Sequence, residues 1–398
     1  MNKTDKLKNN IFNSNRETWL DILKAIAVSS VVFHHAGFPV FFLGMIFVSV
    51  FFISSGYVFK EQSFLQYMKK QFLRLWIPFV VANFLAVLLH NLLTVIGLWP
   101  GYPYEIKDIA LFVVRSFAFC FSDALCSPHW FVFMIFTAGI AFYGLYYLSC
   151  LIAKYLCIKE RRKKEGKEND TVDNANIGTD KFNRVRDIVL GVISAAMFIY
   201  GLIFNHGLNT IMWSNCAFVT NIFYGMILFW FGYAMKRYDL VSKLLSVKMW
   251  AKVVIFAVFT AILSIAFIKG YIADHRAGNF TMAPIVPFIS LMGFVWLLLF
   301  AKAVIEKIPT VRSIVCYMGR NSLYIMLYQG LAYQLVTFIQ VKICHIPYDP
   351  AWQWQNVYMG SGLWVSLAGV CGVLLPLLIP IIKEYFSKVF KSFCSKKS

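Results

Sequence analysis

The feature that most constrains this chain is a series of apolar runs, each roughly 18–22 residues long. A helix of that length crosses about 30 Å of hydrocarbon, and it satisfies its backbone hydrogen bonds internally, as lipid requires. Of the 398 residues, 59% are hydrophobic and only 14% are charged, whereas about a quarter of a soluble domain is charged. The sequence therefore predicts an all-α, polytopic integral membrane protein with about ten transmembrane helices, at about 18–36, 41–59, 75–97, 130–153, 188–205, 214–235, 251–269, 284–305, 321–341 and 360–382.

The distribution of lysine and arginine predicts which segments face the cytoplasm. With the N-terminus inside, the inner segments hold 32 of the 38 Lys and Arg residues, and cytoplasmic loops carry such an excess. The short apolar segment 106–121 is then an interfacial or re-entrant helix, because a full span there would invert everything downstream. This topology gives a cytoplasmic segment 1–17, a membrane domain 18–382 with a flexible basic cytoplasmic loop 154–187, and a cytoplasmic basic tail 383–398.

The composition and motifs also argue against several classes of protein. A net charge of +19 would suggest nucleic acid in a soluble protein, but here the basic residues lie in short loops without an aromatic-basic module. The nine cysteines are scattered, and the chain has no CxxC pair, P-loop, GxSxG, HExxH or Cys/His metal spacing. We therefore expect no nucleic-acid partner, no metal and no tightly bound cofactor.

Ionisable residues inside the first span are the strongest candidates for a functional site. Asp21 and Lys24 lie near one end of segment 19–37, and His34 and His35 lie near the other. Such groups are costly in hydrocarbon and mark functional sites. Lys24 and His35 are eleven residues apart, about 16 Å along nearly the same helix face, a spacing that suits one polar channel. In the alternative interpretation, Lys24 reaches the inner interface and His35 caps the outer helix end.

Polar residues elsewhere have a structural interpretation beside a functional one. Ser54–Ser55–Gly56 interrupts the second span, where small residues more often serve close helix packing than catalysis. His129 and Trp130 open the fourth span, where an interfacial tryptophan is common. Arg320 precedes the ninth span, and a helix N-terminus beside an arginine attracts phosphate, although the following residues also suit helix capping.

Several short motifs follow one another along the chain in an order that a known family shares. They are Asp21, Lys24 and His35; FFISSGY at 51–57; Arg74 with Pro78; Trp130–Phe131; and Gly319, Ser322 and Ile325. In this order they resemble the bacterial acyltransferase-3 membrane acyltransferases, a group that includes O-antigen and exopolysaccharide O-acetylases. The chain departs from the family pattern at Lys24, where arginine is commoner, and at Tyr328-Gln329, where a late histidine often stands. No SGNH-type esterase domain follows the last helix, so the resemblance implies a stand-alone transferase.

The resemblance implies transfer of an acyl group, usually acetyl, from acetyl-CoA to a hydroxyl of a cell-envelope carbohydrate or lipid-linked glycan at the bacterial cytoplasmic (inner) membrane. His35 is then expected to act as general base or as transient acyl acceptor, because the pKa of imidazole lies near neutrality. Lys24 is expected to hold a CoA phosphate or the developing charge, with Asp21 orienting it. The other expected contacts are those of Arg74, Arg320, Ser55 and Gly56 with the donor, and those of His129 and Trp130 with the carbohydrate.

Two other classes of function fit part of the pattern. In a transporter or flippase for envelope glycolipids, Lys24 and His35 would form an intramembrane binding or proton-relay site; the absence of an obvious internal repeat weighs against it. A non-catalytic membrane scaffold does not explain charges inside the first helix. Product formation that depends on acetyl-CoA separates the enzyme from the transporter, and alanine at both positions tests the scaffold. Membrane lipids are expected partners, and the sequence predicts neither the acceptor sugar nor the oligomeric state.

Overall fold

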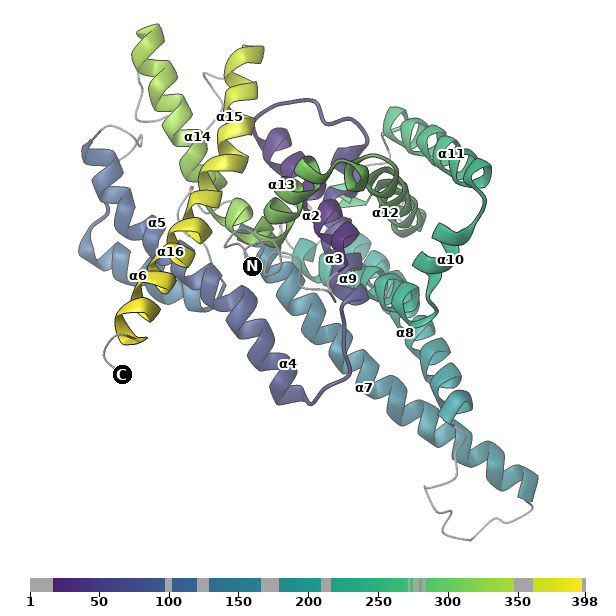
Figure 1. Cartoon of the computed structure of the whole chain (residues 1–398). Coiled ribbons are helices and arrows are strands. Elements are labelled where there is room, and N and C mark those ends of the chain that lie inside the picture. The colour runs from purple at the N-terminus through teal and green to yellow at the C-terminus, as the bar shows by residue number, and fades with distance from the viewer. Residues whose placement is uncertain are drawn as a thin grey trace.

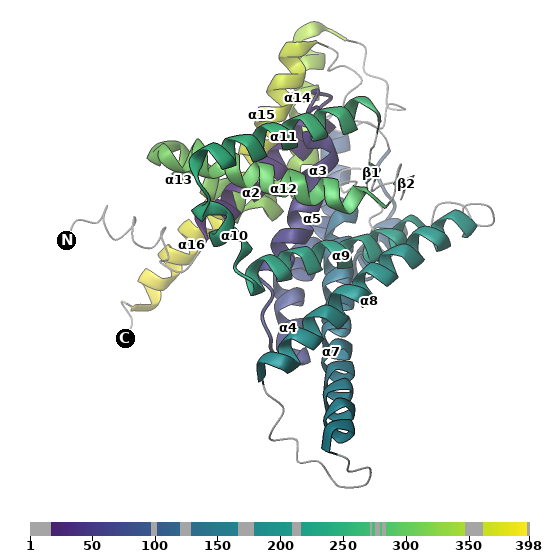
Figure 2. The same ribbon diagram turned by 90° about the vertical axis from the view of Figure 1, so that its right-hand side faces the viewer.

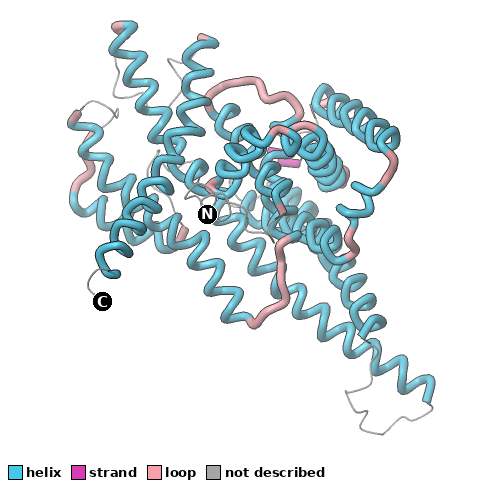
Figure 3. Tube along the Cα trace, in the orientation of Figure 1, coloured by secondary structure: helices cyan, strands magenta, loops and turns pink. Residues whose placement is uncertain are grey.

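The structure, a computed structural model, describes residues 17–96, 102–119, 129–165, 179–208, 216–270, 273–274, 279–280, 284–346 and 361–395. Within these ranges the fold is all-α apart from one antiparallel pair of two-residue strands, β1 (Ala273–Asp274) and β2 (Asn279–Phe280) (Figure 3). The predicted N-terminal segment before residue 17 and the middle of the predicted basic loop lie outside the described residues.

In the described part of the chain, seven helices are long and apolar enough to cross a membrane. They are Phe64–Val95, Trp130–Lys163, Thr179–Ile203, Met249–Ile268, Val286–Lys307, Ser322–Cys344 and Gly362–Lys388. The chain is therefore a multi-pass membrane protein, as predicted. The other predicted spans fall on α2 (Thr18–His35), α3 (Leu43–Tyr57) and α9 (Cys216–Arg237), so the count of ten and the cytoplasmic termini stay predictions.

The described part of the chain also contains helices between and beyond the predicted spans, among them α4 (Phe64–Gln71), α10 (Leu240–Ser246), α13 (Pro309–Arg320) and α16 (Leu378–Ser395). The remaining elements are the π-helical turn η1 (Phe72–Trp76), α5 (Ile77–Val95), α6 (Ile106–Phe117), α7 (Trp130–Glu165), α8 (Thr179–Leu208), α11 (Met249–Ile268), α12 (Val286–Ala303), η4 (Ile305–Lys307), α14 (Ser322–Cys344), α15 (Gly362–Leu374) and η5 (Leu375–Leu377). The short helix predicted at 106–121 is present as α6, and its position relative to the membrane stays a prediction.

Helix α2 lies in the interior of the bundle. It packs against α3, α12, α13, α14 and α15, and both views of the ribbon show it among these helices (Figures 1 and 2). Trp19, Ile22, Leu23 and Val28 are at most 2% exposed. Because other helices cover α2 on several sides, polar residues on those sides, such as Asp21, meet protein, which is the environment expected of functional groups inside a membrane protein.

The charged stretch after the fourth span is more helical than predicted. Helix α7 continues to Glu165 and α8 begins at Thr179, so both ends of the predicted flexible loop 154–187 are helical. Lys, Arg and Glu are good helix formers, and extending an existing helix avoids the cost of nucleation. Figure 1 shows α7 and α8 continuing beyond the rest of the bundle. Helix α4 likewise occupies part of the predicted loop 60–74.

Helices α3 and α9 pack with their backbones in close contact. A Cβ atom at Gly56 would lie 1.9 Å from the carbonyl oxygen of Phe229, and one at Gly232 would lie 1.9 Å from that of Ile53. Such an approach requires glycine. The structure therefore supports the packing interpretation of the small residues in the second span.

Candidate active site

His35 is the last residue of α2, and its imidazole contacts α14. Nδ1 of His35 lies 3.1 Å from Oε1 of Gln329. The His35 side chain is half-buried, whereas the neighbouring His34 is exposed. The two adjacent histidines therefore have different surroundings, and a second helix holds the ring of His35.

Gln329 is fully buried, and both ends of its amide have hydrogen-bond partners. Nε2 donates to the carbonyl oxygen of Met326 at 3.1 Å, and Oε1 accepts from the Tyr333 hydroxyl at 3.0 Å. The hydroxyl shares its single hydrogen between Gln329 Oε1 and the carbonyl oxygen of Val32, which lies 2.6 Å away, and it thereby joins α14 to α2. The sequence marked Gln329 only as a departure from the family pattern and gave it no role.

Near the other end of α2, Asp21 forms an ion pair with Arg320 of α13. Arg320 Nε donates to Asp21 Oδ2 at 3.1 Å; the Asp21 side chain is 1% exposed and that of Arg320 is 22% exposed. A Cβ atom at Gly319 would lie 1.8 Å from the Asp21 carbonyl oxygen, so glycine permits α13 to reach α2. A carboxylate this deeply buried needs a partner charge. Asp21 therefore holds Arg320, and Lys24 lies about one turn further along α2, half-buried.

Cys316 lies on α13 near this ion pair, and the structure argues against it as a nucleophile. Burial, and next the Asp21 carboxylate, raise the pKa of the Cys316 thiol. The thiol therefore stays protonated near neutral pH, whereas the reactive form of cysteine is the thiolate. Of these two side chains, Cys316 and His35, His35 is therefore the stronger candidate for the reactive group.

His129 precedes α7 and is buried, with an exposure of 1%. Its Nε2 lies 2.7 Å from the carbonyl oxygen of Leu327, and its Nδ1 lies 3.1 Å from Nδ2 of Asn83. A carbonyl opposite Nε2 requires the hydrogen there, so Nδ1 accepts from the Asn83 amide. Both ring nitrogens are bonded to protein, which favours a structural role for His129 over the predicted carbohydrate contact. Trp130 is half-buried and stays a candidate for that contact.

Arg74, a predicted donor contact, lies in the π-helical turn between α4 and α5. A proline ring clashes with the carbonyl of the residue four positions earlier, and Pro78 stands four positions after Arg74. The wider turn at Phe72–Trp76 relieves this clash, and π-turns are frequent at functional sites. The Arg74 side chain is exposed, and Ser55 is half-buried. Gly56 is packed against the α9 backbone, which favours a structural role there.

A second set of buried charges joins α7, α8 and α9. We call it the Arg186 cluster; it consists of Arg186, Asp187, Glu61, Tyr146, Tyr233, Arg237 and Tyr238. Arg186 and Asp187 are 3% and 4% exposed, and Arg186 Nη2 donates to Asp187 Oδ1 at 2.9 Å. Sequence reasoning missed this cluster because it assigned Arg186 and Asp187 to the basic loop. An Arg-Asp pair directly before an apolar run was the available signal.

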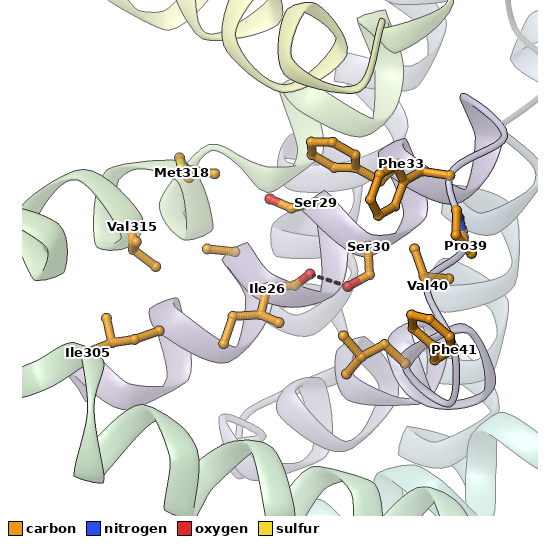
Figure 4. A pocket seen from close by; sticks show the side chains of 13 residues that line it. Ile26, Ser29, Ser30, Phe33, Pro39, Val40, Phe41, Ile305, Val315 and Met318 are labelled. Atoms are coloured by element: carbon orange, nitrogen blue, oxygen red, sulfur yellow. Dashed lines mark hydrogen bonds between the residues drawn. The ribbon is translucent and has the colours of Figure 1, made fainter. Parts of the chain in front are cut away.

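An apolar groove of about 510 Å³ lies along a different face of α2 (Figure 4). Its α2 residues include Ile26, Ser30 and Phe33, and none of the lining residues is titratable. Ser30 donates to the Ile26 carbonyl oxygen at 2.9 Å. Ile26 is nine residues from His35, about two and a half helical turns, so the groove and the imidazole lie on opposite faces. The groove is therefore not the place where His35 is expected to accept or donate a proton.

Comparison with known proteins gives a match over most of the chain. Residues 17–384 match the family model described as an acyltransferase domain. No curated protein matches the chain, and no solved structure does. The matched range includes every candidate residue described above.

Proposed function

Since the chain belongs to the acyltransferase-3 family of membrane acyltransferases, we propose that it transfers an acetyl group from acetyl-CoA to a hydroxyl of a cell-envelope carbohydrate or lipid-linked glycan. The observation that carries this proposal is His35: a half-buried imidazole at the end of an interior helix, held by Gln329 of α14. An imidazole held in this way suits general base catalysis, because its orientation is fixed and its unperturbed pKa lies near neutrality.

Two routes use His35. As general base, it takes the hydroxyl proton while the sugar oxygen bonds to the acetyl carbon; the carbon–sulfur bond breaks, and the proton passes to the CoA thiolate. As transient acyl acceptor, a ring nitrogen first bonds to the acetyl carbon and releases the CoA thiolate. The sugar hydroxyl then takes the acetyl group, and its proton goes to the thiolate. Oxyanion stabilisation and exclusion of water help either route.

Basic residues are the proposed contacts of the donor. Lys24, Arg74 and Arg320 are assigned to the CoA phosphates or the developing charge, because charge-assisted hydrogen bonds to phosphate are strong. Asp21 supports this role by fixing Arg320 through the 3.1 Å ion pair. Ser55 stays a proposed donor contact, and Trp130 a proposed carbohydrate contact, since aromatic faces suit sugar rings.

We place the enzyme in the bacterial cytoplasmic membrane with both termini inside. In that orientation Lys24 lies near the cytoplasmic end of α2, where CoA arrives, and His35 lies toward the outer half. The charge distribution along the sequence supports the orientation.

His35→Ala tests the proposal, with His34→Ala as the matched control on the same helix. Membranes containing each variant receive labelled acetyl-CoA, and label in the acceptor glycan is measured per amount of enzyme. His35→Ala should lower the rate about 10²- to 10⁴-fold, whereas His34→Ala, whose side chain is exposed, should stay close to wild type. Undiminished acetylation by His35→Ala would remove His35 from the chemistry.

Glycan mass spectrometry of a deletion strain tests the substrate class. We expect loss of the mass of one acetyl group from a defined sugar residue. A loss that fits no acyl group, or glycolipid movement without acetyl-CoA consumption, would contradict the transferase and support the transporter.

A further inference from the structure

Gln329 is a polar side chain in an apolar helix, and its exposure is 0%. An amide buried in such surroundings is costly unless its polar atoms are hydrogen-bonded. Its partners are the Met326 carbonyl, the Tyr333 hydroxyl and the His35 ring. The His35 ring belongs to the candidate active site. The orientation of the Gln329 amide therefore determines which kind of hydrogen bond the ring makes with it.

The contacts of Gln329 determine which of its atoms faces His35. Nε2 donates to the Met326 carbonyl oxygen at 3.1 Å. Turning the amide round would set Oε1 against that carbonyl, which places two acceptors together with no hydrogen between them. Oε1 therefore faces Nδ1 of His35 at 3.1 Å, and the hydrogen of this bond lies on Nδ1.

A hydrogen on Nδ1 sets the state of the other ring nitrogen. Neutral imidazole carries one hydrogen, so Nε2 of His35 then carries the lone pair. We propose that Gln329 is a positioning residue whose amide oxygen holds His35 in the tautomer that receives the proton or acyl group at Nε2. This assignment rests on the proposed function. An amide has no titratable group, so Gln329 can hold the ring in this way at any pH at which the protein is folded.

Contacts on both sides of Gln329 hold α14 in place. Leu327, two residues before it, accepts from His129 at 2.7 Å through its carbonyl oxygen. Tyr333, four residues after it, lies 2.6 Å from the Val32 carbonyl oxygen of α2. Helix α14 is thus tied to the start of α7 and to α2 on either side of Gln329. The structural role of His129 is consistent with this arrangement, because it fixes the helix that carries the amide.

Gln329→Met and Gln329→Glu separate positioning from packing. Methionine has a similar length and removes the acceptor, whereas glutamate keeps an oxygen there but buries an acid. Positioning predicts that Gln329→Met lowers kcat about 10- to 100-fold with KM for acetyl-CoA little changed, and that Gln329→Glu retains most of kcat. A packing role predicts the reverse order, because an apolar side chain suits this interior better than an acid does.

Gln334→Met is the matched control, since Gln334 lies on the same helix and is also buried, with 4% exposure. It should keep the wild-type kcat. Rates are measured with labelled acetyl-CoA on the full-length protein in lipid nanodiscs, per amount of monodisperse protein. If Gln329→Met gives no such protein, Gln329→Glu decides alone: a retained kcat supports positioning, and a fall below about a tenth overturns it.

The outcomes separate this assignment from the transferase itself. A normal kcat in Gln329→Met, or equal loss in both variants, overturns the role of Gln329 while the wild-type enzyme still transfers acetyl. Absence of acetyl transfer by the wild-type protein overturns the proposed function and this assignment with it.

Discussion

The Arg186 cluster and the polar contacts of α2 both place ionisable groups inside a membrane protein, but they differ in how far protein groups enclose them. All three guanidinium nitrogens of Arg186 and both carboxylate oxygens of Asp187 are bonded to protein groups, and neither side chain is more than 4% exposed. On α2, His35 and Lys24 are half-buried, and Arg320 keeps 22% exposure beside the buried Asp21. Burial of charge alone therefore does not identify a site. The nearly inaccessible charges of the Arg186 cluster join helices, whereas the half-buried groups on α2 keep part of their surface exposed.

Arg186→Met should give the largest effect. It should also distinguish most clearly the structural role of the Arg186 cluster from the functional role of the polar residues on α2. Removing one partner of a buried charge network costs about 3–5 kcal/mol, because Asp187 then lies between helices without its main donor. We expect a large loss of thermal stability in detergent, with the acetyl-transfer rate per folded protein close to wild type. Normal stability with lost activity would place the Arg186 cluster in the functional machinery and end the distinction.

Gly56→Ala tests whether the small residues of the second span belong to packing or to donor binding. A Cβ atom 1.9 Å from the Phe229 carbonyl oxygen forces α3 and α9 apart, so we expect a loss of about 1–3 kcal/mol in unfolding free energy. Gly144→Ala is the control, since a Cβ atom there has no neighbour within 4 Å. A raised KM for acetyl-CoA without loss of stability would instead return Gly56 to the donor site.

Lys24→Ala tests whether a half-buried charge on α2 contributes to substrate binding rather than to folding. A charge that contacts a substrate should affect binding more than folding, so we expect KM for acetyl-CoA to rise about tenfold. Lys24→Arg keeps the charge and should stay within about threefold of wild type. Initial rates over a range of acetyl-CoA concentrations measure both, and equal losses in the two variants would contradict a role based on charge.

Tyr333→Phe should have the smallest effect. It removes the hydroxyl that meets both Gln329 and the Val32 carbonyl, but Gln329 keeps its bond to Met326. We expect kcat to fall about two- to fivefold, the size of one lost hydrogen bond. Tyr317→Phe is the control, because within the described residues the Tyr317 hydroxyl has no hydrogen-bond partner. A fall as large as that of Gln329→Met would show that Tyr333 orients the amide.

Much of the architecture could be predicted from the sequence because hydrocarbon permits few backbone conformations. The predicted spans at 251–269 and 284–305 correspond to α11 (Met249–Ile268) and α12 (Val286–Ala303). The charged ends of the loop 154–187 are helical rather than flexible as predicted, because Lys, Arg and Glu have high helix propensity even where charge is dense. Arg186 and Asp187 were assigned to that loop because they are charged, although their partners bury them.

The sequence predicted the candidate residues Asp21, Lys24 and His35 on α2 and Arg320 on α13, but not which side chains contact one another. Asp21, Lys24 and His35 stand out because each is ionisable within an apolar run. Their pairing does not, since Arg320 is 299 positions from Asp21 and Gln329 is 294 positions from His35. These pairs depend on how α13 and α14 pack against α2, and on Gly319, whose missing side chain allows one of those contacts. A single sequence does not indicate which residues so far apart along the chain will contact one another.

Helix α2 is continuous from Asp21 to His35, and under the proposed function its length sets a requirement for the donor. Lys24 and His35 are eleven residues apart on this one helix, about 16 Å at 1.5 Å per residue. A donor whose phosphates rest near Lys24 must therefore carry its thioester on an arm that covers this distance. Coenzyme A has such an arm in its pantetheine chain. A thioester with the same head group and a shortened arm would bind and yet fail to react, so helix length would select for acetyl-CoA independently of any contact with the acetyl group.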